Sequence, residues 1–379
     1  MKVVCDEAIA DALAAFGGEG IDQLCLLSAR HIDAESIRGA DAVIVRSTVQ
    51  VDERLFAHHT PRYVGTATIG CDHIDLDLLS ERGCHFLSAQ GSSAASVAQF
   101  TWAMIMHLTQ IQKRPLASYR MGVVGCGAIG ERVARCGEHL GLDVLRVDPW
   151  LNEENPNGPH VDALQDCDLI SLHVPLIHDG PHATAEMITE TWLKALPSGA
   201  TIINTARGGL IHRPALLDAL RGKNLASVAL DVFPAEPAVD VALLSACSLA
   251  TPHIAGRSME GMAANTKVVA DEFRTHFGLP KYEAASDSLS APLIQVSPAT
   301  DIEDFLAEIW NLPAIDQQMK ESVRGSEEER AVAFRQMRKP PYRRDLTSYS
   351  IGGEMSPELE QFLNALQTTT TKIDSERQS

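Results

Sequence analysis

The chain has 379 residues, of which 45% are hydrophobic and 22% charged, and its formal net charge is −18 at pH 7. This length is enough for two or three domains, each with its own apolar core. The negative charge argues against nucleic acid or an anionic membrane as a partner, because the protein's own field would repel both. An anionic substrate would need basic groups gathered at its site.

The start of the chain and the cysteines both favour a cytoplasmic protein. Asp6 and Glu7 interrupt the first apolar run, so we expect no signal peptide. The most apolar long stretch, Val97 to Leu108, is too short to span a bilayer. The eight cysteines include no C-x-x-C pair and mostly have apolar neighbours. They are typical of reduced core thiols, as found in the cytoplasm.

Residues 1–95 alternate short apolar strands with helical segments, which is typical of a small α/β domain with a parallel sheet. The expected strands are Lys2–Cys5, Ala42–Val45, Tyr63–Thr66 and His85–Leu87. Arg46 and Ser47 follow the second of these strands, and Thr68 follows the third. Ligands of open α/β sheets collect at the carboxyl ends of strands, so these three residues are candidate ligand contacts. The simpler interpretation is that both segments are polar loops.

The strongest local signal is a G-x-G-x-x-G motif that begins at Gly125, directly after the apolar run Met121–Val124. The run predicts a buried strand, and the apolar spacing after the motif predicts a helix. Glycines at such a turn let a pyrophosphate approach the backbone, and the first N–H groups of the helix face the anion. The candidate cofactor turn comprises Gly125, Gly127, Ala128, Ile129 and Gly130.

Asp148 follows a second predicted strand, Asp143–Val147. A carboxylate at this position can accept both ribose hydroxyls of an adenosine and would repel a 2′-phosphate, which favours NAD over NADP. The alternative is that the glycines only form a packed turn in a protein that binds no nucleotide.

The alternation continues after the motif, so residues 96–255 are predicted to form a doubly wound domain. Further strands are expected at Leu169–His173, Thr201–Asn204, Ser227–Leu230 and Leu249–Thr251, and a helix at Pro214–Arg221. A helix from Ser92 to Thr109 would lead into this domain, and a long helix within 256–285 would return to the first one. Residues 286–379, with several prolines and charged runs, would form a small separate domain for association or for covering the site.

Three polar residues follow strands of this domain: Arg207 in TARGG, Glu236 in DVFPAEP and His253 in TPHIAG. Arg207 would hold a carboxylate with two hydrogen bonds. His253 would take the hydroxyl proton of a 2-hydroxy acid as the hydride leaves, and Glu236 would orient the imidazole. Taken singly, the three could instead be a surface ion pair, a turn acid and a loop histidine.

Two more residues follow predicted strands. Asp231 either faces the nicotinamide carboxamide or caps a turn. His173, in SLHVPL, is expected to face the cofactor with its backbone rather than to use its ring in catalysis.

These motifs together resemble the D-isomer-specific 2-hydroxyacid dehydrogenases. The resemblance rests on GCGAIG, ARGG, AEP and TPHIAG, and it extends through VRST, GTATIGCDHIDLD and SLHVPLIHDGPH. The tail sequence FRQMRKPPYRRDL resembles the C-terminal dimerisation domain of those members that oxidise 4-phospho-D-erythronate in vitamin B6 biosynthesis. The resemblance covers nearly the whole chain.

The resemblance implies a flavodoxin-like substrate domain over 1–95 and 256–285, a Rossmann-type NAD domain over 96–255, and a small α+β dimerisation domain over 286–379. It implies a homodimer, without a metal, that uses NAD to oxidise 4-phospho-D-erythronate at C2 to 2-oxo-3-hydroxy-4-phosphobutanoate. The implied catalytic residues are Arg207, Glu236 and His253, and the implied substrate contacts are Ser47, Thr68 and Arg257. The implied NAD contacts outside the glycine turn are Asp148, Val174, Thr205, Ala206, Asp231 and Gly256.

Some positions depart from the family's usual pattern. Arg257 stands where the family usually has tyrosine, and it either contacts the substrate phosphate or points to solvent. Ser93 replaces an expected asparagine, and Gln99 replaces a common acid. In the tail, Arg343 or Arg344 either reaches a site in the partner subunit or forms an ion pair at a surface or interface.

The sequence leaves two other functions open. One is a dehydrogenase of another 2-hydroxy acid, such as 3-phosphoglycerate, which the tail and VRST disfavour. The other is a noncatalytic NAD-binding regulator, which the joint presence of Arg207, Glu236 and His253 disfavours.

Overall fold

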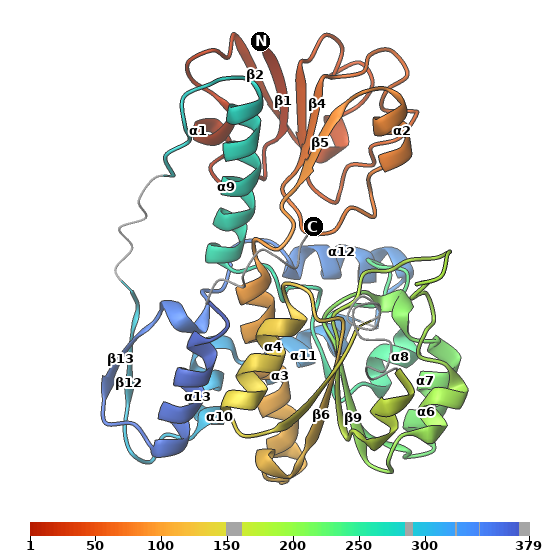
Figure 1. The fold of residues 1–379 in the computed structure, drawn as a ribbon, viewed down its shortest axis with the longest axis vertical. Helices are drawn as coiled ribbons and strands as arrows, with labels where there is room; N and C mark the ends of the chain where they lie inside the picture. The colour runs from red at the N-terminus through yellow and green to blue at the C-terminus, as the bar shows by residue number, and fades with distance from the viewer. Residues whose placement is uncertain (149–160, 285–290, 323, 341, 371–379) are drawn as a thin grey trace. The chain divides into compact units, whose positions relative to one another are not determined.

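The computed structural model describes residues 1–148, 161–284, 291–322, 324–340 and 342–370 (Figure 1). The chain divides into two compact units, Met1–Ser93 with Met259–Ser290 and Ala94–Ser258 with Ala291–Ser379. Each unit is built on one large parallel sheet, and this confirms the predicted α/β class.

The first unit has a five-stranded sheet in the order β2-β1-β3-β4-β5, which is the order of flavodoxin-like sheets. Its strands are β1 Lys2–Asp6, β2 Gln23–Leu27, β3 Ala42–Val45, β4 Tyr63–Thr66 and β5 His85–Ser88. The inner strands β3 and β4 are buried throughout, as expected for a parallel sheet covered on both faces. The strand β2 was not predicted. It is a half-exposed edge strand, although its residues Leu24 to Leu27 form a continuous apolar run.

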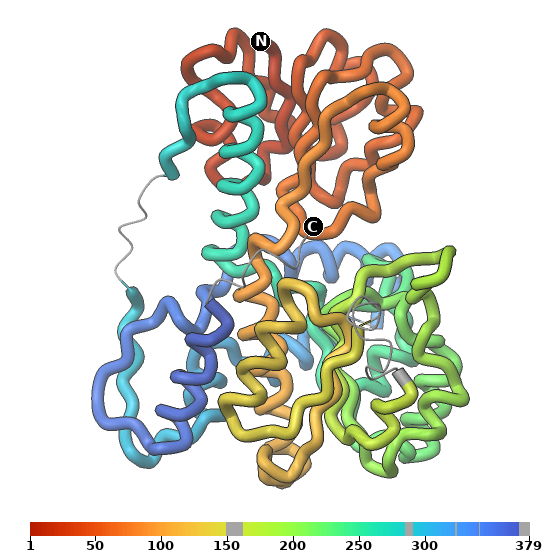
Figure 2. The backbone as a smooth tube through the Cα atoms, viewed as in Figure 1, coloured from red at the N-terminus to blue at the C-terminus, as the bar shows by residue number. Residues whose placement is uncertain are grey.

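Three helices belong to this unit: α1 Ala12–Phe16, α2 Leu76–Glu81 and α9 Met259–His276. The predicted return helix is α9, which Figure 2 shows beside the N-terminal residues of the same unit. Phe273 of α9 packs edge-on against Phe16 of α1, with 5.6 Å between ring centroids. Val269 and Phe273 are fully buried, so the return helix completes the apolar core of the first unit.

The second unit has a six-stranded sheet in the order β11-β10-β9-β8-β6-β7. Its strands are β6 Arg120–Val124, β7 Asp143–Val147, β8 Leu169–Leu172, β9 Ala200–Asn204, β10 Leu225–Leu230 and β11 Leu249–Ala250. All six lie where the sequence predicts strands. The order reverses at β6, since the chain winds from β6 to β7 on one side and to β8 on the other.

Helices cover both faces of this sheet. The helices α3 Ala94–Ile111 and α4 Gly130–His139 lie on one face, and three others lie on the opposite face (Figure 1). Those three are α6 Glu190–Ala195, α7 Arg213–Arg221 and α8 Val241–Ala246. Both helices predicted here, Ser92–Thr109 and Pro214–Arg221, are confirmed within two residues at each end.

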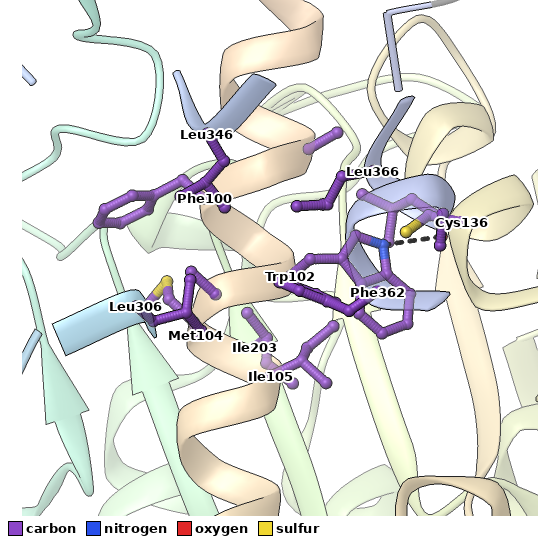
Figure 3. Close-up of a cluster of buried hydrophobic side chains, with 14 of the residues drawn as sticks. Phe100, Trp102, Met104, Ile105, Cys136, Ile203, Leu306, Leu346, Phe362 and Leu366 are labelled. Atoms are coloured by element: carbon purple, nitrogen blue, oxygen red, sulfur yellow. Dashed lines mark hydrogen bonds between the residues drawn. The ribbon is translucent and has the colours of Figure 1, made fainter. Parts of the chain in front are cut away.

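The described residues after 290 add four α-helices and a pair of parallel strands to the second unit. These are β12 Leu293–Val296, α10 Ile302–Trp310, α11 Leu312–Ser322, α12 Glu327–Met337, β13 Ser350–Gly353 and α13 Pro357–Gln367. In Figure 3, Leu306, Phe362 and Leu366 lie around Phe100 and Trp102 of α3, all within one buried cluster. This apolar contact joins the C-terminal residues to α3, which covers one face of the sheet. The predicted division of the chain at residues 95, 255 and 285 stays a prediction.

Short 3₁₀ turns, η1 Ala29–His31, η2 Leu116–Ser118, η3 Val161–Asp166, η4 Gly208–Leu210 and η5 Leu346–Ser348, complete the described elements. Among the residues that the structure describes, no helix combines the length and apolar character that a membrane crossing requires. The same residues contain no group of three or more His, Cys, Asp or Glu side chains suited to hold a metal ion.

Candidate active site

The glycine turn connects β6 to α4. Gly125 has a φ of 86°, and a Cβ on it would lie 2.8 Å from the carbonyl carbon of His173. A Cβ on Gly130 would lie 1.8 Å from the Gly125 carbonyl oxygen, whereas one on Gly127 would meet nothing within 4 Å. The turn itself therefore requires Gly125 and Gly130, while the open side of Gly127 leaves room for a phosphate group. The turn fits a dinucleotide.

Asp148 follows β7 and lies against this turn, because the Cys126 backbone N–H donates to its Oδ2 at 2.6 Å. Dinucleotides bind where the strand order of such a sheet reverses, which here is at β6. Burial raises the pKa of the Cys126 thiol to about 12, and the charge of Asp148 adds to the increase. The thiol is therefore protonated at neutral pH, which disfavours its oxidation. All eight cysteines are free thiols.

The other predicted cofactor contacts follow strands of the same sheet. Val174 follows β8, whereas Thr205 and Ala206 follow β9, and all three are buried. The Ala206 N–H already donates to the side-chain oxygen of Asn204 at 3.0 Å. Within the turn, the Ala128 carbonyl accepts from Arg132, and Ile129 is the residue before α4. Their contacts with a cofactor stay predictions.

His173 is a half-buried histidine rather than a candidate acid. Burial lowers the pKa of its ring to about 3. Its Nε2 lies 2.8 Å from the Ser171 hydroxyl, and its backbone N–H donates to the Val124 carbonyl at 2.7 Å. A ring that stays neutral at working pH cannot serve as a general acid, in keeping with the preference for its backbone.

Arg207 lies on a short loop after β9 that Asn204 shapes. The Asn204 side chain accepts from the Ala206 N–H and donates to the Arg207 carbonyl at 2.9 Å. The next residue, Gly208, packs on the backbone of Phe233, since a Cβ on it would lie 2.0 Å from the Phe233 carbonyl carbon. The loops after β9 and β10 are therefore in direct contact. Arg207 is half-buried on the first of them.

Glu236 and His253 form a hydrogen-bonded pair. Glu236 Oε2 lies 2.7 Å from His253 Nδ1, and Glu236 Oε1 accepts from the Phe233 N–H at 2.9 Å. Burial raises the pKa of Glu236, but the charge and hydrogen bond of His253, the Phe233 N–H and the charge of Arg338 together lower it below its usual value. Glu236 is therefore ionised at neutral pH and fixes the tautomer and orientation of the imidazole.

Residues 251–258, which we call the histidine loop, are held by Asp231. Its Oδ1 accepts from the Thr251 hydroxyl at 2.6 Å and the Ile254 N–H at 2.8 Å, and its Oδ2 accepts from the Ala255 N–H at 2.9 Å. The side chain is fully buried, and burial raises its pKa. His253 adopts a left-handed φ of 56°, which is unfavourable for a residue with a side chain. The three bonds to Asp231 hold the loop in that conformation.

The predicted substrate contacts Ser47 and Thr68 belong to the first unit. Ser47 is exposed after β3. Its neighbour Arg46 makes a two-point ion pair with the buried Asp6, with Nε–Oδ2 at 2.9 Å and Nη2–Oδ1 at 3.2 Å. Asp6 therefore fixes the guanidinium of Arg46 at this end of the sheet.

Thr68 is part of a hydroxyl network after β4. Its Oγ1 donates to the Gly70 carbonyl at 3.0 Å and lies 2.8 Å from the Thr66 hydroxyl. The Thr66 hydroxyl is also 2.9 Å from Nε2 of the buried His73. We call residues 67–74 the threonine loop. Its hydroxyl network joins residues that are neighbours in sequence, while its backbone also bonds Val51, Ala89 and Asn265.

The structure shows the surroundings of the positions that depart from the family pattern. The guanidinium carbon of Arg257 lies 5.6 Å from the centroid of the Tyr342 ring. The backbone N–H of Arg257, the residue after Gly256, donates to the Ile254 carbonyl at 2.8 Å. Gln99 is fully buried and bonds Thr347 through both the backbone and the side chain, at 3.3 and 3.2 Å. Ser93 is also buried.

Sequence reasoning missed two residues that shape this site. Asn204 ends the strand TIIN, and asparagine after a strand is a known turn former, so a signal was present. The close contact of Gly208 with Phe233 links residues far apart in the sequence, and a single glycine does not reveal its partner.

The fold is shared with solved dehydrogenases. D-lactate dehydrogenase from Aquifex aeolicus, complexed with NAD and lactic acid, superposes with a TM-score of 0.62, 24% identity and coverage of 73% of this chain and 95% of that one. D-2-hydroxyisocaproate dehydrogenase gives a TM-score of 0.57 and 22% identity, with 76% and 100% covered.

Sequence comparisons define the family more narrowly. The family model "D-isomer specific 2-hydroxyacid dehydrogenase, NAD binding domain" matches residues 88–255. The erythronate-4-phosphate dehydrogenase of Azotobacter vinelandii is 35% identical, with 97% of this chain and 99% of that one aligned. That of Pseudomonas aeruginosa PAO1 is 33% identical with the same coverage. The chain therefore belongs to the erythronate-4-phosphate dehydrogenases of the D-isomer-specific 2-hydroxyacid dehydrogenase family.

Proposed function

We propose that this protein uses NAD to oxidise 4-phospho-D-erythronate at C2 to 2-oxo-3-hydroxy-4-phosphobutanoate, a step of vitamin B6 biosynthesis. The observation that carries the proposal is the pair of Glu236 and His253, 2.7 Å apart on loops that follow strands of the sheet bearing the glycine turn. The full-length similarity to erythronate-4-phosphate dehydrogenases supports the choice of substrate.

The chain's own residues divide the chemistry among them. The glycine turn and Asp148 would hold NAD, which supplies the hydride acceptor when bound. Arg207 would bind the substrate carboxylate and polarise the C2 oxygen. His253, whose Nδ1 is bonded to Glu236, would take the C2 hydroxyl proton on Nε2 as the C2 hydride leaves and the carbonyl forms. The negative charge of Glu236 stabilises the resulting imidazolium.

The finer assignments follow from the resemblance of the sequence motifs to the family. Ser47, Thr68 and Arg257 are proposed substrate contacts, and the arginine supplies positive charge that an acidic protein needs for a phosphorylated substrate. We propose that Val174, Thr205, Ala206, Asp231 and Gly256 line the cofactor. We also propose that the protein forms a homodimer through residues 286–379 and that it is located in the cytoplasm.

Steady-state assays separate this function from its alternatives. We expect NAD-dependent turnover of 4-phospho-D-erythronate, measured as NADH formed, with a much higher kcat/KM than for 3-phosphoglycerate. Equal values for the two substrates would favour a dehydrogenase of broader or different specificity. NAD binding without turnover of any 2-hydroxy acid would favour a regulator.

The role of His253 is tested by His253→Ala. Proton transfer by a positioned side chain contributes about 10²–10⁴-fold, so kcat should fall by at least about 10²-fold while NADH still binds. The matched control is His139→Ala, which removes an exposed histidine at the end of α4 and should leave kcat within about 2-fold. A His253→Ala variant with wild-type kcat would exclude the mechanism.

A further inference from the structure

The histidine loop is also held from its other side, by an arginine far along the chain. Arg343 Nη2 donates to the carbonyl of Ala255, and also to the Ser96 carbonyl at 3.2 Å. The backbones of Ser258 and Arg343 are joined by a parallel β-bridge. Arg343 thus contacts both α3 and the loop within its own chain.

The Arg343 guanidinium is enclosed and oriented by its surroundings. It lies 4.7 Å from the Phe100 ring centroid and 4.4 Å from that of Trp310, and its side chain is 11% exposed. Asp345 pairs with Arg343 Nη1 at 3.2 Å. Two aromatic faces and a carboxylate leave the planar guanidinium few alternative orientations.

A hydroxyl chain ties the same segments together. The Ser258 hydroxyl donates to Ser96 Oγ at 2.8 Å, and the Ser96 hydroxyl donates to Asp345 Oδ2 at 2.7 Å. All of these groups are buried. The far end of the histidine loop is thus fixed to α3 and to the segment after Tyr342.

We propose that Arg343 is a positioning residue for proton transfer, acting on His253 through the carbonyl of Ala255. The inference rests on the proposed function, in which His253 moves the substrate proton. Ala255 lies two residues beyond His253, and both of its backbone groups are held: Asp231 accepts from its N–H and Arg343 donates to its carbonyl. A non-glycine residue with a left-handed φ, such as His253, persists only where the surrounding structure holds it in that conformation. Asp231 supplies one such constraint and Arg343 supplies the second.

The choice of residue follows from the chemistry of this contact. One guanidinium donates from Nη2 to two carbonyls, on α3 and on the histidine loop, while Nη1 pairs with Asp345. Lysine has a single nitrogen on a flexible stem and cannot hold the same fork. The Arg343 guanidinium is therefore engaged by residues of its own chain.

The test compares Arg343→Met, Arg343→Lys and Arg344→Met in the full-length protein. Arg343→Met keeps an apolar chain between the two aromatic rings but removes the donors. We expect its kcat to fall roughly 10–10²-fold with unchanged KM for NAD and unchanged NADH affinity, because a small displacement of a catalytic group costs this much. Arg343→Lys should recover part of kcat. Arg344→Met removes the neighbouring charge but leaves the bonds of Arg343, so hydrogen exchange in the histidine loop should match wild type.

Hydrogen exchange gives a readout that does not depend on turnover. In Arg343→Met the amides of Ile254 and Ala255 should exchange faster than in wild type and Arg344→Met. Wild-type kcat and exchange in Arg343→Met would overturn the inference, as would a parallel loss of NADH affinity and of thermal stability, which would indicate a general structural role. If wild type turns over no 2-hydroxy acid, the proposed function fails, and the exchange data still decide whether Arg343 orders the loop.

Discussion

Two loops that follow parallel strands carry predicted site residues, and these residues are supported differently. In the threonine loop of the first unit, the Thr68 hydroxyl belongs to a network with Thr66, Gly70 and His73, all within seven residues of one another, although the loop backbone also bonds the distant Asn265. The histidine loop of the second unit is held by Asp231 and Arg343, which lie 24 and 88 residues from Ala255.

The difference explains what each loop can tolerate. A local network forms wherever its short segment adopts the right turn, so its loss is felt mainly within that segment. The histidine loop has a local bond, from the His253 N–H to the Thr251 carbonyl at 3.0 Å, but its bonds to Asp231 and Arg343 depend on the whole unit being folded. Removing a distant support should therefore change both stability and chemistry.

The largest expected effect follows Asp231→Ala. It leaves the Thr251 hydroxyl and the N–H groups of Ile254 and Ala255 buried without their acceptor, and unsatisfied donors cost about 1–3 kcal/mol each, less relaxation. We expect the free energy of unfolding of Asp231→Ala, measured with urea, to be lower than that of wild type by about 3 kcal/mol. Its kcat should also be lower.

The control for this change is Asp301→Ala. Asp301 also accepts a backbone N–H, from Asp304 at 2.8 Å, but it is an exposed helix cap. Its loss should cost about 1 kcal/mol, with kcat unchanged. Equal losses of stability and activity in the two variants would contradict the special role of the distant support.

Glu236→Gln should act next most strongly, on chemistry more than on folding. The amide keeps the size of the side chain but loses the charge beside His253, so kcat should fall by about 10²-fold while NADH affinity is kept. Glu308→Gln, an exposed acid in α10, is the control. Unchanged kcat in Glu236→Gln would exclude the pair from proton transfer.

The same variant has a predictable dependence on pH. The folded protein lowers the pKa of Glu236, so its carboxylate stabilises the fold above the unfolded value of about 4.3, and this contribution is lost as pH falls through the lower folded value. The difference in unfolding free energy between wild type and Glu236→Gln should therefore shrink below about pH 4.3. A constant difference in that range would contradict the assignment.

The comparison of the two loops also shows what the sequence can reveal. The glycine turn, the six strands of the second sheet and the threonine loop were recognisable because their signals lie in short contiguous segments. Glu236 and His253 were paired by chemical reasoning, and the structure joins them at 2.7 Å. Both are residues whose neighbours in sequence mark a strand end.

The rest could not be predicted, because it depends on contacts between distant segments. The role of Asp231 stayed undecided between cofactor and turn, and its three bonds to the histidine loop became visible only in the structure. Nothing near Arg343 in the sequence indicates that its guanidinium faces Ala255 between two aromatic rings. Edge strand β2 is a different case, since its apolar run Leu24 to Leu27 was a usable local signal that the sequence reasoning overlooked.

Thr66→Val should have the smallest effect. It removes the hydroxyl that joins Thr68 to His73 while it keeps the shape of a fully buried side chain, so the first unit should lose about 1 kcal/mol of stability. We expect KM for the substrate to rise by a few-fold, roughly the equivalent of 1 kcal/mol, with kcat unchanged, because the proton-transfer residues lie in the other unit.

Thr266→Val is the matched control for that change, because this buried hydroxyl donates to the Met262 carbonyl of its own helix, at 3.2 Å. It should leave KM at the wild-type value and stability within about 0.5 kcal/mol. If Thr66→Val lowered kcat as strongly as Glu236→Gln, the threonine loop would be part of the proton-transfer machinery and the contrast between the loops would fail. If instead KM alone moved, local support in the first unit would govern substrate binding, and distant support in the second would govern chemistry.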